Sequence, residues 1–363
     1  WPDLFAYLGL LRRLVLHCAT RCIFASSSEL CGFSMRQACS CSAVQFTNYW
    51  MRAFSRAGIE PGEAKASLGC FLSSVLGRRA ALEVCKHVVF RLVSEDSIFF
   101  PFRSQIQTRP ESAKHILPRH MNRLNYYCQR RAQRLPVQYI LGEWHFHGLP
   151  LKMCPPIFIP RPETEALVDI VLSHINHSDG GTERILDIGC GTGAICLALA
   201  SRTTKVHYTG IDKNVLAVKL AEENASQLGL SKRVSCYEAE VTATGLKCLL
   251  PQLMSSVYDV IVSNPPYIAI QESHSIEPEV LRHEDHAALF AGADGLDVVR
   301  GILQLSRTRL KVGGHLFIEV GLSHPPLIQA MLAAQEYSQM FKLLAVHPDF
   351  TLRPRFVEIK RIK

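Results

Sequence analysis

The stretch from residue 184 onward constrains the fold most, because apolar runs of strand length alternate there with segments of helical periodicity. The strand-like runs are 184–188, 205–211, 234–239, 258–263 and 315–320, and helical patterns cover 192–201, 214–228 and 296–310. Strands joined by crossover helices form a mostly parallel sheet covered on both faces. A short connection joins the last two runs, 341–346 and 356–359, so one of them should be antiparallel. The pattern predicts a doubly wound α/β domain.

Changes in composition divide the chain into four parts. Residues 1–45 are rich in Arg and Ser and poor in acids, which is typical of a mitochondrial transit segment; the alternative is a tail without fixed structure. Residues 46–135 are mostly of helical periodicity and predict a small helical domain. Apolar residues alternate with turn residues over 136–160, which predicts a β-hairpin that links two domains. The α/β domain should occupy residues 161–363.

Charge and cysteine content narrow the class of protein. The net charge is +8, and residues 1–56 carry 6 − 2 = +4 of it, from six arginines against Asp3 and Glu29, so the body is only mildly basic. The 13 cysteines form no CxxC pair, which favours a reducing compartment over a disulfide or metal framework. We interpret His145 and His147 as outward residues of one strand. No apolar run reaches the ~20 residues of a membrane-spanning helix.

A glycine-rich turn follows the first predicted strand and opens a helix; its residues after Asp187 and Ile188 are Gly189, Cys190, Gly191, Thr192 and Gly193. Glycine lets the backbone turn tightly and approach a ligand without a clash at Cβ. The spacing also fits a dinucleotide fingerprint, whereas a GxGxG turn after an acid suits S-adenosylmethionine. Asp212, at the end of the second predicted strand, can accept hydrogen bonds from the ribose hydroxyls of either ligand.

The motif Asn264-Pro265-Pro266-Tyr267 directly follows a predicted strand, at the edge of the sheet where ligands bind. An amide or exocyclic amino nitrogen is a poor nucleophile because its lone pair is delocalised. The Asn264 side-chain oxygen and the Pro265 carbonyl can accept both of its hydrogens, and the Tyr267 ring offers a flat wall. The motif therefore predicts methyl transfer from S-adenosylmethionine to a planar nitrogen, by positioning and electrostatics.

With these motifs, residues 47–363 resemble the HemK/PrmC family of peptide chain release factor glutamine methyltransferases, its mitochondrial members in particular. The resemblance also rests on the stretches 136–144 (PVQYILGEW) and 159–165 (IPRPETE). It implies a class I S-adenosylmethionine-dependent methyltransferase, with a Rossmann-like, mostly parallel seven-stranded sheet. The helical domain 46–135 would then recognise the substrate.

The resemblance implies N5-methylation of the glutamine side chain in the Gly-Gly-Gln motif of a release factor, in the mitochondrial matrix. The catalytic residues would be Asn264, Pro265, Pro266 and Tyr267, and the cofactor would contact Gly189, Cys190, Gly191, Thr192, Gly193, Asp212 and Asn264. In the family, a position just after the third strand contacts the cofactor, and it corresponds here to Glu240 and Val241. An acid at this position can bind the adenine amino group. Val241 replaces an aromatic residue of some members. Arg161 is expected to form a structural salt bridge.

Two other functions stay open. An adenine-N6 nucleic-acid methyltransferase shares the chemistry but needs a basic groove and a domain that reads bases, against which the mild charge weighs. A binding module could keep the fold without catalysis, although an intact Asn264 argues against it. We expect a release factor as partner, a monomer, and no metal, membrane or stable nucleic-acid contact.

Overall fold

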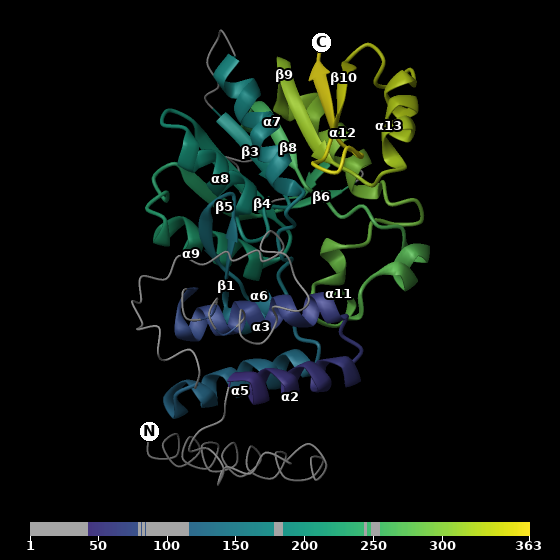
Figure 1. Ribbon diagram of the computed structural model, residues 1–363. Coiled ribbons are helices and arrows are strands. Elements are labelled where there is room, and N and C mark those ends of the chain that lie inside the picture. The colour runs from purple at the N-terminus through teal and green to yellow at the C-terminus, as the bar shows by residue number, and fades with distance from the viewer. Residues whose placement is uncertain are drawn as a thin grey trace, which may run out of the picture.

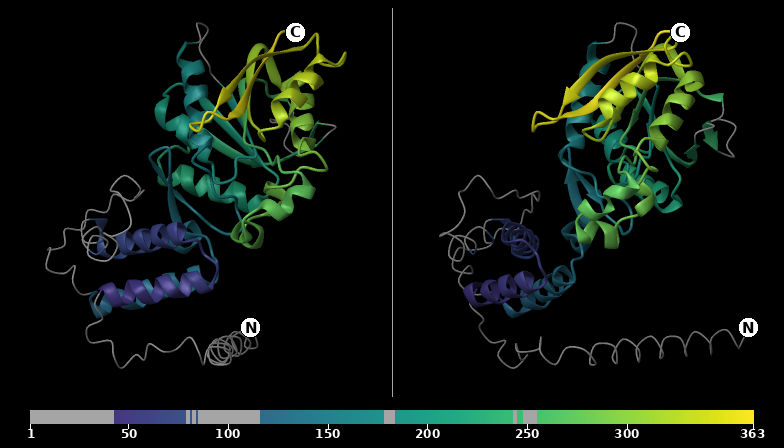
Figure 2. Two further views of the ribbon diagram at one scale, coloured as in Figure 1. Left: turned by 45° about the vertical axis from the view of Figure 1, so that its right-hand side comes forward. Right: turned by 90° about the vertical axis from the view of Figure 1, so that its right-hand side faces the viewer.

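The computed structural model describes residues 43–78, 81, 84, 116–177, 184–242, 245–247 and 255–363. A helical region lies beneath an α/β domain, and the segment that contains α11 faces the helical region (Figures 1 and 2). The expected transit segment lies outside the described residues except for 43–45, which begin the first described helix.

The helical region contains α2 (Ala43–Arg56), α3 (Pro61–Leu76) and α5 (Pro118–Ala132). Trp50 and Phe54 lie four residues apart on the buried face of α2 and share one core with Phe71 of α3. Pro61 starts α3, where a missing N–H costs nothing, and Gly77 follows its last turn at φ 83°. The apolar spacing therefore gives the packing that the sequence predicts.

The linker differs from the predicted hairpin. The 136–160 stretch begins with a short helix, α6 (Val137–Leu141), which Gly142 ends in the left-handed conformation at φ 75°. The hairpin is only β1 (Glu143–Phe146) paired with β2 (Leu149–Lys152). His147 lies in the turn between them at φ 50°, so only His145 is a strand residue and the shared-face interpretation was wrong.

The seven-stranded sheet has the order β10-β11-β9-β8-β3-β4-β5. Its strands are β3 (Arg184–Ile188), β4 (His207–Asp212), β5 (Val234–Glu238), β8 (Tyr258–Ser263), β9 (Leu310–Glu319), β10 (Phe341–Pro348) and β11 (Pro354–Arg361). Strand β11 is antiparallel to both β9 and β10, and the inner pairs are parallel. This confirms the predicted α/β fold, including the reversed strand.

Helices cover both faces of the sheet (Figure 1). They are α7 (Thr164–His177), α8 (Ala194–Arg202), α9 (Val215–Gln227), α12 (Asp297–Arg309) and α13 (His324–Ala333). Along β8, Val260 and Val262 enter the core beneath α7 and α8, while Ile261 enters the core beneath α12. Within the described ranges, no helix is long and apolar enough to cross a membrane.

Several short elements were not predicted. Strands β6 (Glu240–Thr242) and β7 (Gly245–Lys247) form a small antiparallel pair. Between β8 and α12 lie the 3₁₀ turns η4 (Ile270–Ser275) and η5 (His286–Ala288) and the helix α11 (Pro278–His283). They are too short to show a hydrophobic period, so periodicity could not predict them.

Polar contacts tie the outer strands together. Glu358 of β11 lies 2.8 Å from His315 Nδ1 on β9 and 2.9 Å from His347 Nε2 on β10. Hydrogen bonds with these two imidazoles lower the pKa of Glu358 to about 2. His174 of α7 joins His315 and Glu358 in a group whose ligand-type atoms lie within 4.8 Å of one another. The expectation that the chain holds no metal stays a prediction.

Candidate active site

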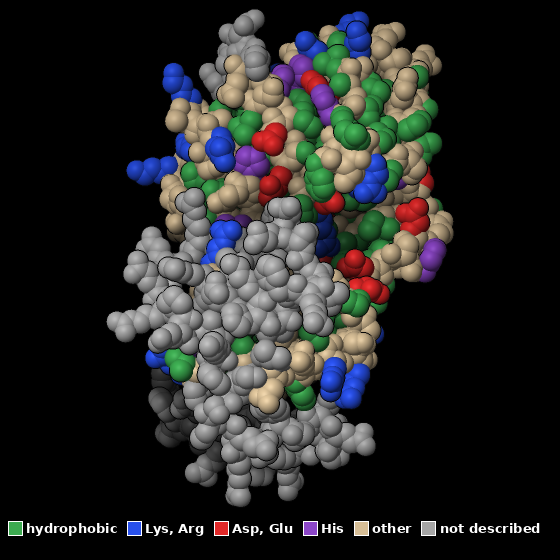
Figure 3. Space-filling model, in the orientation of Figure 1, with side chains coloured by type: hydrophobic (Ala, Val, Ile, Leu, Met, Phe, Trp, Pro, Cys, Tyr) green, Lys and Arg blue, Asp and Glu red, His purple; other side chains and the backbone are tan. Residues whose placement is uncertain are grey.

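A cavity of about 460 Å³ opens at the carboxyl ends of β3, β4 and β8. Its lining includes the expected residues Gly189, Cys190, Gly191, Thr192, Asp212, Glu240, Val241, Asn264, Pro265, Pro266 and Tyr267. Ligands of parallel α/β sheets bind at this edge. The surface is hollowed above α11 in Figure 3. Of the sequence-predicted site residues, Gly193 alone does not line this cavity.

The glycine turn is held against β4 by backbone bonds. The N–H groups of Gly189 and Cys190 donate to the carbonyl of Ile211 at 2.8 and 3.0 Å. Gly189 and Gly191 have φ values of 73° and 55°, which glycine adopts without strain. A Cβ on Gly189 would lie 3.9 Å from the backbone oxygen of Asn264, so the turn and the Asn-Pro-Pro-Tyr motif adjoin.

Gly193 lies outside the cavity lining, and its bare Cα has a structural role. Its φ is 81°, and a Cβ there would lie 2.9 Å from Leu197 Cδ1 and 3.2 Å from Ala221 Cβ. The glycine therefore allows α8 to start sharply and α9 to pack closely. Helix α8 begins at Ala194, two residues after the predicted start, because Thr192 and Gly193 belong to the turn.

Asp212 ends β4 with its carboxylate held in place. Oδ2 accepts a hydrogen bond from the Gly191 N–H at 3.0 Å, and Oδ1 accepts one from the Asn214 N–H at 2.9 Å. Burial raises the pKa of Asp212 although both N–H groups favour its ionised form. The geometry fits an acceptor for vicinal hydroxyl groups.

Glu240 and Val241 line the cavity from β6, just after β5 as expected. Gly301 of α12 lets β6 come close, because a Cβ there would lie 2.8 Å from the carbonyl oxygen of Thr242 and 3.0 Å from Val241 Cγ1. The Glu240 carboxylate also lies 3.7 Å from Lys247 Nζ on β7, and Val241 offers an aliphatic side chain to the cavity.

Asn264 is oriented by a chain of hydrogen bonds. Its Nδ2 donates to Thr164 Oγ1 at 3.0 Å, and Thr164 Oγ1 donates to Glu319 Oε2 at 2.8 Å. A carboxylate only accepts, so Thr164 must donate to Glu319 and accept from Asn264. This directionality leaves the Oδ1 atom of Asn264 as the acceptor that its side chain can offer in the cavity.

Glu319 lies at the end of β9 and is only 1% exposed. Burial raises the pKa of Glu319 to about 7, although the hydrogen bond from Thr164 acts to lower it. The hydroxyl of Tyr267 donates to Glu319 Oε1 at 3.4 Å, and burial raises the pKa of Tyr267 to about 12. The buried carboxyl group of Glu319 therefore contacts both Thr164, which orients Asn264, and Tyr267, the last residue of the Asn-Pro-Pro-Tyr motif.

The motifs in the sequence did not predict a second wall of the cavity, which Asn214, Asp285 and Arg161 help to line. Asn214 Nδ2 donates to Asp285 Oδ2 at 3.0 Å, and Arg161 pairs with Glu284 at 2.8 Å. The Arg161 guanidinium also lies 4.7 Å from the centre of the Phe158 ring. The expected salt-bridge geometry of Arg161 is present. The family-like stretch 159–165 was the available signal, and it meets Glu284 and Asp285 of the η5 segment here.

The cavity suits the cofactor that the motifs indicate. Glycines give it a bare backbone at the turn, a half-buried carboxylate stands at the end of β4, and apolar residues such as Ile188 and Ile211 complete its lining. These features suit a nucleoside ligand whose ribose hydroxyls donate to the carboxylate. The turn, Asp212 and the Asn-Pro-Pro-Tyr motif at one sheet edge together define an α/β methyltransferase.

Comparison with known proteins agrees. The Methyltransferase small domain model matches residues 164–342. The chain is 36% identical over 325 residues to the Homo sapiens MTRF1L release factor glutamine methyltransferase, covering 88% of each chain. It is 35% identical over 212 residues to the release factor glutamine methyltransferase of Geobacter sulfurreducens, covering 58% of this chain and 70% of that one. The chain belongs to the release factor glutamine methyltransferase family.

The two glycines of the turn should respond differently to alanine. Gly193→Ala forces a left-handed alanine against Leu197 and should cost about 1–3 kcal/mol of folding free energy, seen as a lower melting temperature. Gly191→Ala also places alanine in a left-handed backbone, at a cost of about 1 kcal/mol, but the new methyl meets nothing within 4 Å. It should therefore lower the melting temperature less than Gly193→Ala and should mainly weaken S-adenosylmethionine binding, measured by calorimetry. The reverse pattern would contradict these assignments.

Removal of the Thr164 hydroxyl should uncouple Asn264 from Glu319. Thr164→Val should lower kcat for methyl transfer about 10-fold or more, because the amide loses its orientation, and leave S-adenosylmethionine affinity within about twofold. Thr164→Ser keeps the hydroxyl and serves as the control. Wild-type kcat in the valine variant would exclude the orienting role.

Glu319 should give the enzyme a pH dependence. Because its pKa is about 7, kcat should fall as the pH drops below that value, when the protonated carboxyl competes as a donor to Thr164. The folded-state pKa lies above the usual 4.5, so stability should also decrease as pH rises from 4.5 to about 7. Glu319→Gln should flatten both profiles, measured as kcat and melting temperature against pH; unchanged slopes would assign them to another group.

Proposed function

We propose that this chain transfers the methyl group of S-adenosylmethionine to the side-chain nitrogen of glutamine in the Gly-Gly-Gln motif of a peptide chain release factor. The observation that carries the proposal is the orientation of Asn264 by Thr164, which presents an acceptor beside the Pro265 carbonyl. Two adjacent acceptors match the two hydrogens of a primary amide. Family membership supports the same substrate.

The residues of the cavity would have separate roles in binding the cofactor and in holding the substrate amide. The bound cofactor supplies an activated methyl sulfonium, so no general base is needed for attack. Asn264 and Pro265 would hold the amide, Pro266 would stiffen the turn, and Tyr267 would stack against the planar group. The turn 189–192 and Asp212 would hold the methionine and ribose parts, and Glu240 with Val241 the adenine. Gly193 would support the site by allowing α8 and α9 to pack closely.

We also propose roles for the outer parts of the chain. The helical domain, expected at 46–135 and beginning in the structure at Ala43, would recognise the body of the release factor, and residues 161–363 would carry methyl transfer. The Arg-rich, acid-poor composition of 1–45 supports import into the mitochondrial matrix. A monomer without stable nucleic-acid contact would suffice.

Mass spectrometry of a release factor after incubation with this protein and S-adenosylmethionine tests the activity. We expect one added methyl group on the Gly-Gly-Gln glutamine and none on a factor with that glutamine replaced. Asn264→Ala should lower the rate about 10²–10³-fold, since it removes one of two fixed acceptors, and should spare cofactor binding.

An adenine-containing oligonucleotide in the same reaction separates the alternatives. Methyl on adenine and none on the factor would assign the site to a nucleic-acid substrate. Transfer to neither, with the cofactor still bound, would contradict the proposed reaction. Full activity of Asn264→Ala would show that the amide is held elsewhere.

A further inference from the structure

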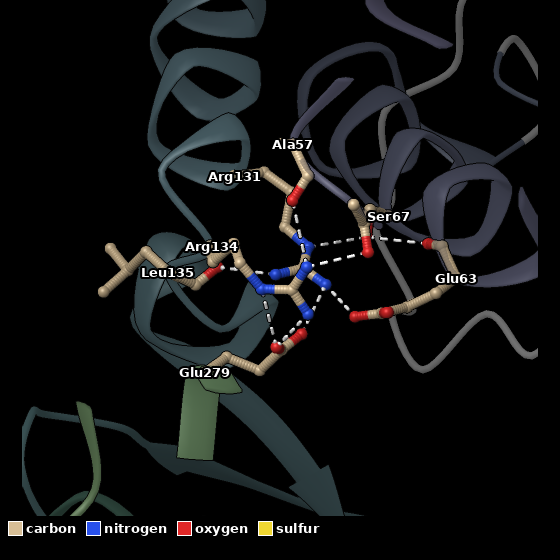
Figure 4. Close-up of polar contacts among 8 residues, drawn as sticks. Ala57, Glu63, Ser67, Arg131, Arg134, Leu135 and Glu279 are labelled. Carbon is tan, nitrogen blue, oxygen red and sulfur yellow. Dashed lines mark hydrogen bonds and ion pairs between the residues drawn. The ribbon is translucent and has the colours of Figure 1, made fainter. Parts of the chain in front are cut away.

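One carboxylate joins the helical region to the α/β domain. Glu279 of α11 accepts from Arg131 Nη2 at 3.1 Å through Oε1, and from Arg134 Nε at 3.0 Å and Nη2 at 2.5 Å through Oε2 (Figure 4). Arg131 is 1% exposed and Glu279 is 5% exposed. Although burial opposes ionisation, the hydrogen bond from Arg134 and the two positive charges lower the pKa of Glu279.

The two arginines extend these contacts through the helical region. Arg131 donates to Ser67 Oγ at 3.2 Å and forms an ion pair with Glu63, both on α3. Arg134 donates to the carbonyls of Ala57 and Gly58 at 3.0 and 2.8 Å, just after α2. Residues at or near the ends of α2 and α3 therefore contact two arginines at the end of α5, and both arginines bind Glu279 of the α/β domain (Figure 4).

The backbone of Arg134 both ends α5 and serves this contact, because the Leu135 N–H donates to the Arg130 carbonyl at 3.2 Å, as at other left-handed helix ends. Its φ is 63°, a left-handed backbone that costs a side-chain-bearing residue about 1 kcal/mol. The bend follows α5 and directs the guanidinium to Glu279 and to the end of α2 at once. A buried carboxylate that loses such a partner is strongly destabilised, so the contact favours one relative placement of the two domains.

Glu279 is also next to the cavity. The same cavity that Asn264 lines is also lined by three chain neighbours of Glu279, namely Ile276, Glu277 and Val280. The contacts of Glu279 with the two arginines therefore anchor the helical region beside one wall of the cavity.

We propose that Glu279, Arg131 and Arg134 form a positioning network that fixes the helical region relative to the methyl-transfer cavity for a folded protein substrate. The proposal rests on the proposed function and deepens it. A substrate that contacts both domains gains from their fixed spacing, because the second contact then forms at high effective concentration. Loosening the spacing weakens capture of the protein and leaves the chemistry of the captured glutamine unchanged.

Steady-state kinetics of Glu279→Gln with a full-length release factor test this role. We expect KM for the factor to rise about 10-fold, kcat at saturating factor to stay within about twofold, and the Kd for S-adenosylmethionine to be unchanged. Glu272→Gln is the matched control: it removes the same charge from exposed η4, outside the network and the cavity lining, and should behave as wild type.

Arg134→Gly is the second variant, because glycine accepts the left-handed backbone while the guanidinium is lost. It should reproduce the rise in KM even if Glu279→Gln folds poorly. An unchanged KM in either folded variant, or a fall in kcat at constant KM, would overturn the positioning role. Failure of the wild-type protein to methylate any factor would instead overturn the proposed function, so the two failures are distinguishable.

Discussion

Parallel pairing of β3 with β8 is the constraint on which the site depends. Ile188 and Ser263 are register partners, and Ser263 Oγ donates to the Ile188 carbonyl at 2.7 Å. The residues that follow these two positions are the glycine turn and the Asn-Pro-Pro-Tyr motif, so a shift by one residue would separate the turn from the motif. Because side chains alternate along a strand, the same shift would also turn buried residues outward. Core packing therefore sets the active-site geometry.

The sequence predicted what short-range patterns encode. Strand–turn–helix alternation identified the sheet and its reversed strand, and the motifs placed all but one of the expected site residues around one cavity. It could not predict contacts between distant positions. Thr164 and Glu319 are 155 positions apart, and nothing in the local pattern around either residue indicates that they meet.

Local departures of the structure from the sequence-based expectations have physical causes as well. Gly193 has the spacing of a ligand-binding glycine, but its need for a bare Cα comes from Leu197 and Ala221. Tyr139 and Ile140 have the apolar character of strand residues, but Pro136 and Gly142 bracket a single helical turn there. The wall around α11 consists of turns too short for periodicity, so only resemblance pointed to it.

The position of β11 has a consequence for the end of the chain. The last strand of the sequence is not an edge strand, since it lies between β9 and β10. Phe356 pairs with Glu319, and the carbonyl of Arg355 accepts from the Val320 N–H at 2.9 Å. The backbone that carries the buried carboxyl behind Thr164 and Asn264 is therefore braced by Arg355 and Phe356 of β11. A truncation shortly before these residues would spare every motif and still leave the Asn264 side chain without its support.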